Sequence, residues 1–184
     1  MDRAAHEADA DNLTIRAREP EDAAGMSALM GAPGTFEGTL QMPDMPVASR
    51  LEHLSRVEAG GCSLVAVAAG RVVGCAGLHL NGASMRRAHA RSLGIGVALE
   101  WQGRGVGRRL IARLLDWADN WANVLRVELV VHADNDRAQA LYRNMGFVEE
   151  GRHRDYALKD GRFVDALAMA RLHPRPPLLR TAAG

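Results

Sequence analysis

Two hydrophobic patterns follow one another along the chain. Alternating apolar and polar residues, or apolar runs of about four to eight positions, are typical of β-strands, and apolar residues recurring every three or four positions are typical of amphipathic helices. We therefore expect strands at residues 13–17, 63–69, 72–80, 89–99, 126–131, 147–158 and 162–172. We expect helices at residues 21–30, 47–58, 105–122 and from 135 to about 145.

Turn signals separate these elements. Gly70-Arg71 and Asp160-Gly161 each lie between two strand-like runs and predict tight hairpins. Asn135 is a good N-cap for the last helix, and Gly146 is a good stop for it. Residues 31–46 hold three prolines and three glycines and predict a long irregular loop, a kind of segment that is often functional in compact domains.

Length, charge and cysteine content narrow the class of protein. The 184 residues suit one domain, and 23 basic against 22 acidic residues give a net charge of +1, so no strong field favours nucleic acid or membrane as a partner. Cys62 and Cys75 lack Cys-x-x-Cys spacing and follow no secretory signal, so we expect reduced thiols in a cytoplasmic protein. We expect a disordered leader at 1–12, a domain at 13–172 and a flexible tail at 173–184.

A glycine-rich stretch in the middle of the chain is the strongest candidate for a ligand site. An apolar run ends at Leu99, glycines follow at 103, 105 and 107, and a helical pattern begins at Val106. Such a strand–turn–helix unit presents backbone N–H groups and the positive end of a helix dipole to an anion, most naturally a pyrophosphate. The alternative is a tight connection with no ligand. The dinucleotide motif G-x-G-x-x-G and the P-loop motif are both absent.

Two segments resemble a known family. Gln102-Gly103-Arg104-Gly105-Val106-Gly107 is similar to the Q/R-x-x-G-x-G/A loop of GNAT superfamily N-acetyltransferases, and the segment Asn135–Phe147 is similar to their N-x-x-A-x-x-L-Y-x-x-x-G-F segment. The order of expected elements over residues 13–172 also resembles that fold. The resemblance implies a single α/β (α+β) domain, in which four helices flank a mixed, mostly antiparallel sheet of about seven strands.

The resemblance also implies acetyl-CoA as co-substrate and no metal. The pyrophosphate would bind backbone N–H groups of the glycine loop, and the pantetheine arm would pair with the end of the preceding strand as an added strand does. The residues expected to bind acetyl-CoA are Val97, Ala98, Leu99, Gln102, Gly103, Arg104, Gly105, Val106, Gly107, Arg108 and Asn135.

Tyr142 is the residue that the resemblance implies for catalysis. In the family's mechanism an amine attacks the thioester directly and a tyrosine protonates the departing thiolate, which suits a phenol because its ordinary pKa of about 10 exceeds the thiol's of about 8.5. The alternative is a tyrosine that only packs against the sheet. A general base is less evident: residues 91–96 contain no carboxylate, Glu100 is expected to be structural, and His132 or His79 could act through a water.

The sequence constrains the acceptor substrate less than it constrains the cofactor. The loop at Thr39–Pro43 and the last two strands resemble bacterial enzymes that acetylate free apolar L-amino acids. That likeness implies a small-molecule amine and a pocket containing Phe36, Leu40, Gln41 and Tyr156. Two alternatives stay open, a protein N-terminal or lysine acetyltransferase and a non-catalytic acyl-CoA-binding module. The long apolar strands near the C-terminus favour a homodimer.

Overall fold

The structure, a computed structural model, describes residues 13–42, 44–55, 60–82 and 84–178. The expected leader at 1–12 and the last six residues of the expected tail lie outside the described residues. Residues 173–178 contain neither helix nor strand. No helix in the described ranges is both long enough and apolar enough to cross a membrane.

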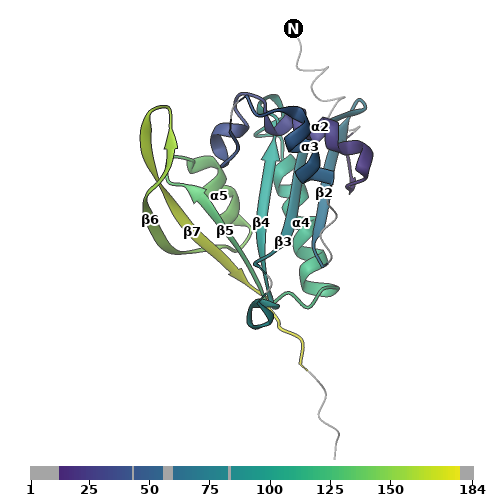
Figure 1. Cartoon of the computed structure of the whole chain (residues 1–184). Coiled ribbons are helices and arrows are strands. Elements are labelled where there is room, and N and C mark those ends of the chain that lie inside the picture. Colours follow the sequence, from purple (N-terminus) through teal and green to yellow (C-terminus); the bar gives the residue numbers. More distant parts are fainter. Residues whose placement is uncertain (1–12, 43, 56–59, 83, 179–184) are drawn as a thin grey trace, which may run out of the picture.

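One open sheet of seven strands runs through the molecule, in the order β1-β2-β3-β4-β5-β7-β6 (Figure 1). Every neighbouring pair is antiparallel except β4 and β5, which are parallel. This confirms the mixed, mostly antiparallel sheet that the family resemblance implied. The strands are β1 (Thr14–Ala17), β2 (Cys62–Ala68), β3 (Arg71–Leu80), β4 (Ala90–Val97), β5 (Arg126–His132), β6 (Val148–Lys159) and β7 (Arg162–Leu172).

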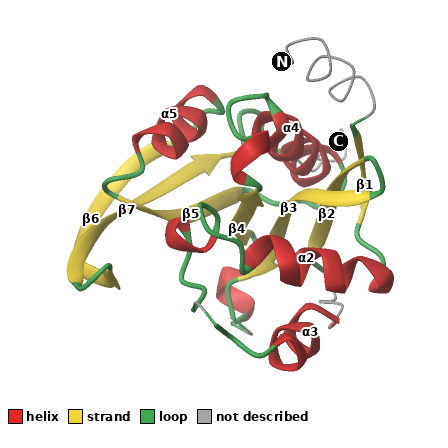
Figure 2. Cartoon of the chain, turned by 90° about the horizontal axis from the view of Figure 1, so that it is seen from above, coloured by secondary structure: helices red, strands yellow, loops and turns green. Residues whose placement is uncertain are grey.

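Helices cover both faces of the sheet, with α4 and α5 on one side and α2 and α3 on the other (Figure 2). The α-helices are α2 (Ala23–Met30), α3 (Val47–Ser55), α4 (Val106–Asn120) and α5 (Asp136–Asn144). The 3-10 turns are η1 (Pro20–Asp22), η2 (Phe36–Gly38), η3 (Met85–Arg87) and η4 (Leu99–Trp101). The end of the helix expected at 47–58 lies partly outside the described residues.

Two expected boundaries were wrong for local reasons. The first hairpin turns at Ala69-Gly70, with φ values of 47° and 73°, and Arg71 already pairs with Ala68. A two-residue turn of this kind needs positive φ at both positions, so a glycine at the second position fixes the turn one residue before the expected Gly70-Arg71. The strand expected to reach residue 99 ends at Val97, because the chain then tightens into η4.

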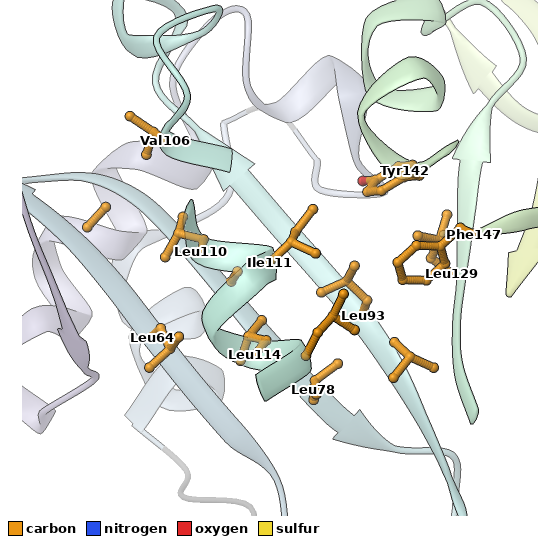
Figure 3. Packing of buried hydrophobic residues seen from close by; sticks show 14 of the residues in the cluster. Leu64, Leu78, Leu93, Val106, Leu110, Ile111, Leu114, Leu129, Tyr142 and Phe147 are labelled. Carbon is orange, nitrogen blue, oxygen red and sulfur yellow. The ribbon is translucent and has the colours of Figure 1, made fainter. Parts of the chain in front are cut away.

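The main core lies between the sheet and α4. Leu110, Ile111 and Leu114 are fully buried against strand residues that include Leu64 and Leu78 (Figure 3). Each such side chain contributes about 1.5–3 kcal/mol by leaving water. Trp121, which lies within the helix expected at residues 105–122, is 79% exposed because α4 ends at Asn120.

The sheet opens between β4 and β5. These strands pair only from Ala90↔Arg126 to Ser92↔Glu128; beyond that, residues 93–97 pair with β3 alone and residues 129–132 with β7 alone within the described sheet. Figure 1 shows the two strands diverging from their shared end into a V. At the open end, β4 runs into the glycine loop and β5 into α5, so both sequence motifs lie at the mouth of the V.

Candidate active site

The glycine loop joins β4 to α4, and two of its glycines are required by the backbone conformation. Gly103 and Gly105 have φ values of 76° and 79°, a region that L side chains rarely adopt. A Cβ at either position would meet no atom within 4 Å, so the space beside them is open. Gly105 is the N-cap of α4, and the first-turn N–H groups of a helix have no partner inside it. The loop can therefore hydrogen-bond an anion.

Gly107 is required for a different reason. It lies within α4, and a Cβ there would sit 3.1 Å from Cδ2 of Leu141 in α5 and 3.6 Å from Cδ1 of Ile95 in β4. The glycine thus lets the two helices and the strand pack closely at the mouth of the V. Its neighbour Val106 is 1% exposed, so only its backbone is available to a ligand, whereas Arg108 is exposed.

Gln102 connects three segments around the mouth. Its Nε2 donates to the carbonyl of Val97 at 2.8 Å and to that of Gly34 at 3.1 Å, and its Oε1 accepts from Arg137 in α5. The side chain therefore braces the long loop, β4 and α5 against one another. Arg137 was not singled out by sequence reasoning, although it lies inside the second motif and its position there was the available signal.

Arg104 and the end of β4 border the glycine loop. The guanidinium carbon of Arg104 lies 5.4 Å from the centre of the Trp101 ring, which keeps this exposed cation beside the loop. The Val97 carbonyl also accepts from Thr35 Oγ1 at 3.4 Å, and the Ala98 N–H donates to Val73 at 2.9 Å. Leu99 is 58% exposed.

Tyr142 lies on α5 and is 7% exposed, with its ring packed against Phe147 at 5.8 Å between centroids. Figure 3 shows the hydroxyl directed away from Phe147, and among the described residues it makes no hydrogen bond. Burial raises the pKa of the phenol to about 12. The side chain is thus a protonated donor without a partner.

Asn135 caps α5 and touches the long loop. Its Oδ1 accepts from the Ala138 N–H at 3.1 Å, which confirms the expected N-cap, and its Nδ2 lies 3.5 Å from where a Cβ of Gly38 would be. Since Gly34 packs against Leu99 on the other side, the loop spans the mouth of the V from β4 to α5.

The expected pocket residues fall into two groups. Phe36, Leu40 and Gln41 lie on the loop across the mouth; Leu40 is 64% exposed, and the other two are half-buried. Tyr156 lies on β6, is 39% exposed and has its ring 5.3 Å from that of His153. The structure thus brings the first group near the glycine loop and leaves Tyr156 on the β6–β7 hairpin.

Comparison with protein families decides what this arrangement is. Residues 32–147, which include the long loop, the glycine loop and α5, match the model of the acetyltransferase (GNAT) family. The chain belongs to the GNAT acetyltransferase family. It is accordingly an acyl-CoA-dependent N-acetyltransferase, as the paired motifs had implied.

Relatives of this GNAT enzyme include proteins with named substrates. An L-amino acid N-acetyltransferase of Escherichia coli is 35% identical over 160 residues, covering 87% of this chain and 98% of the relative. A Vibrio cholerae spermidine N-acetyltransferase, solved with CoA and spermine, has a TM-score of 0.75 at 27% identity and covers 89% and 96% of the two chains. A Sinorhizobium meliloti phosphinothricin acetyltransferase with acetyl-CoA shares the fold at a TM-score of 0.78 and 20% identity, covering 88% and 89%.

The basic and acidic groups of this GNAT enzyme are distributed unevenly around the V. His132 is 5% exposed at the end of β5, and its Nδ1 is enclosed without a hydrogen-bond partner in the described structure. His79 is exposed on β3, with its ring beside Gly77 and Gly94. Glu100 is 57% exposed and lies 3.8 Å from Arg71. No group of three or more potential metal ligands occurs within the described ranges.

Proposed function

We propose that this GNAT enzyme transfers the acetyl group of acetyl-CoA to the primary amine of a small molecule, a free apolar L-amino acid, with Tyr142 as general acid. The observation that carries the proposal is Tyr142, whose largely buried side chain, on the helix that adjoins the glycine loop, keeps its phenol protonated and, among the described residues, without a hydrogen-bond partner. A proton donor of this kind beside a pyrophosphate-binding loop suits thioester aminolysis.

The proposed acetyl-CoA site uses this chain's backbone more than its cations. The N–H groups at Gly103, Gly105 and the first turn of α4 would hold the pyrophosphate, with Arg104 and Arg108 as exposed cations nearby. The pantetheine arm would lie along residues 93–99, where β4 has no neighbour on its open side in the described sheet. The Vibrio cholerae relative, solved with CoA at 27% identity, supports coenzyme A as the acyl carrier.

The proposed reaction is a direct transfer. The amine nitrogen forms a bond to the thioester carbonyl carbon, the carbon–sulfur bond breaks, and Tyr142 protonates the departing thiolate. The resulting phenolate then takes a proton from the nitrogen, which leaves the neutral amide and restores Tyr142. A phenol with a pKa near 12 keeps its proton through neutral pH, whereas a thiol near 8.5 readily takes it. Positioned proton transfer of this kind contributes about 10²–10⁴-fold in rate.

The acceptor class rests on one relative and on the lining of the mouth. The Escherichia coli enzyme acts on L-amino acids by its name and matches this chain over nearly its whole length. On the loop across the mouth, Phe36 and Leu40 offer apolar surface to a side chain and Gln41 offers a polar contact. Tyr156 would add its hydroxyl from the separate β6–β7 hairpin. A free apolar amino acid fits such a mixed lining.

The test is an acetyl-CoA screen that follows thiol release over free amino acids, polyamines, aminoglycosides and peptides. We expect turnover with methionine, phenylalanine or a close analogue, and a Tyr142→Phe enzyme whose kcat is about 10²–10⁴-fold lower with unchanged acetyl-CoA affinity. Acetylated peptides without acetylated amino acids would favour a protein acetyltransferase. Coenzyme A binding without turnover of any acceptor, with the same affinity in Tyr142→Phe, would identify a binding module.

We further propose a cytoplasmic homodimer that associates through the β6–β7 hairpin. Apolar side chains lie exposed along this hairpin, with Val148 at 65%, Leu158 at 66% and Phe163 at 65%. Apolar surface of this kind is typical of interfaces. Light scattering distinguishes a dimer from a monomer, and replacing Leu158 and Phe163 by serine is expected to give the monomer.

A further inference from the structure

His132 has an unusual environment for a titratable group. The residue is the last of β5 and is 5% exposed. Its Nδ1 is buried and has no hydrogen-bond partner in the described structure. The other ring nitrogen, Nε2, is not enclosed in this way. Buried polar atoms without partners are rare and cost stability, so an exception calls for a functional reason.

The position of His132 along β5 places its side chain on the other face of the sheet from Tyr142. Val127, Leu129 and Val131 belong to the core cluster that also contains Tyr142, on the α4 and α5 side of the sheet. Successive side chains of a strand point to opposite faces, so His132 belongs to the other face, the one that carries α2 and α3. The Tyr142 side chain of α5 therefore lies on one side of the sheet, and the imidazole of His132 in β5 lies on the other.

A cross-strand row links His132 to the expected acceptor pocket. His132 pairs with Ala166 in β7, and Ala166 pairs with His153 in β6. Residues directly opposite in antiparallel strands share a face, and Ala166 has only a methyl group to place between the two imidazoles. His153 in turn contacts the ring of Tyr156, a proposed pocket residue.

The charged groups around His132 are mostly paired with one another. Asp134, whose carboxyl interacts electrostatically with His132, bonds Lys159 of β6 at 2.6 Å. Asp165 of β7 bonds Arg152 at 2.7 Å. In the described part of the chain neither carboxylate hydrogen-bonds His132, so its imidazole is not committed to an ion pair.

We propose that His132 accepts the proton that the acceptor ammonium must lose before attack, through Nε2 or one bridging water. This deepens the proposed function and rests on it. The ammonium gives one proton to His132, and the free amine forms the carbon–nitrogen bond. As the carbon–sulfur bond breaks, sulfur takes the Tyr142 proton and the phenolate regains one from the nitrogen. His132 then releases its proton to solvent, so one proton is produced per turnover.

The test compares His132→Gln with the unaltered enzyme on two acceptors, L-methionine and L-methionine amide, between pH 6 and 10. The amide's ammonium is the more acidic, because it lacks the neighbouring carboxylate, and it needs a base less. We expect kcat/KM at neutral pH to fall about 10²-fold for methionine, less for the amide, and to recover as rising pH deprotonates the acceptor in solution. His89→Gln, an exposed histidine, is the matched control and should change neither profile.

Other results would overturn the inference. An equal loss for both acceptors at every pH, together with a lower melting temperature, means a structural role. If His79→Gln shows the acceptor-dependent loss instead, His79 is the residue that accepts the proton from the ammonium. Absence of turnover by the unaltered enzyme contradicts the proposed function itself, whereas a normal pH profile in active His132→Gln contradicts this inference alone.

A second readout does not depend on turnover. In an enzyme with ¹³C-labelled histidine, the imidazole resonance that is missing from His132→Gln belongs to His132. We expect this resonance to shift when L-methionine amide is added and the His89 resonance to stay in place. No shift at saturating amine would place the acceptor elsewhere.

Discussion

At the scale of single residues, the three glycines of the loop have two separate tasks. Gly103 and Gly105 supply left-handed backbone beside open space, whereas Gly107 supplies the missing side chain between α4 and α5. The spacing of the glycines in sequence indicated an anion site. It could not separate these tasks, because φ and the distance to Leu141 depend on how the helices meet.

Substitutions in and away from the glycine loop are expected to have different effects on acetyl-CoA binding and on stability. Gly105→Val puts a β-branched residue at φ 79°, which costs about 1–3 kcal/mol and distorts the N–H groups at the start of α4, so we expect acetyl-CoA binding to be lost in calorimetry. Gly70→Val introduces the same strain at φ 73° in the first hairpin and should lower stability without changing binding. Gln102→Ala should only weaken binding, and equal effects at 102 and 105 would contradict a backbone-based clamp.

The sequence predicted the site residues only in part. Tyr142 was predicted from its motif, but its burial and unpartnered hydroxyl depend on Phe147 and the sheet. His132 could only be one of two candidates, because the seven histidines of the sequence carry no spacing signal and only the fold shows that His132, among the histidines whose burial is described, is buried. The roles of both stay predictions.

At the scale of elements, local signals placed most helices and strands well. Asn135 and Gly146 bracket α5 as expected, and Asp160-Gly161 turns the last hairpin with φ values of 49° and 74°. The errors came where tertiary contacts decide. Trp121 fits the apolar period of α4, yet the helix ends before it.

One contact between elements predicts a stability effect. Arg171 of β7 donates to both carboxylate oxygens of Asp119 near the end of α4, at 2.9 and 2.7 Å, with the two side chains 14% and 16% exposed. Asp119→Ala leaves a mostly buried guanidinium without this partner, so we expect the free energy of unfolding to fall by about 2–4 kcal/mol in urea titrations. Asp116→Ala, on the exposed side of the same helix, should cost less than about 1 kcal/mol. A similar loss for both would show that the pair is not special.

At the scale of the whole molecule, the two halves of the sheet meet along a short parallel seam. Glu128, at the last paired position, accepts from Asn81 at 2.8 Å, from Arg126 at 2.7 Å and from Arg87. Arg126 also donates to Glu150 of β6. This network holds the closed end of the V. The short seam could not be predicted from the sequence, because the residue pattern of a strand does not show how far a neighbouring strand pairs with it.

The network predicts how stability depends on pH. Burial acts to raise the pKa of Glu128, but hydrogen bonds from Arg126 and Arg87 outweigh it and lower the pKa. A carboxyl whose folded pKa is depressed stabilises the fold above its unfolded pKa of about 4.3 and loses this contribution as pH falls through the folded value. Unfolding free energy of Glu128→Gln should therefore be about 1–2 kcal/mol lower at pH 7, with the gap closing below about pH 4.

Exposed Glu100 provides the control for this measurement. Its carboxylate is 57% exposed and 3.8 Å from Arg71, so Glu100→Gln should change stability by less than about 1 kcal/mol at any pH. A gap for Glu128→Gln that persists undiminished in acid would mean that its charge does not stabilise the seam.

If the proposed acetyl-CoA site is correct, the divergence of β4 and β5 would couple the stability of the fold to the supply of coenzyme A. A strand-like pantetheine arm lying in the V would complete two strand edges that have no neighbour there, so the bound molecule becomes part of the sheet. By mass action, such a ligand at 100 times its dissociation constant adds about 2.7 kcal/mol to stability. Spent coenzyme A carries the same arm and would stabilise comparably. The lifetime of the folded enzyme should then follow the total coenzyme A pool more closely than its acetylated fraction.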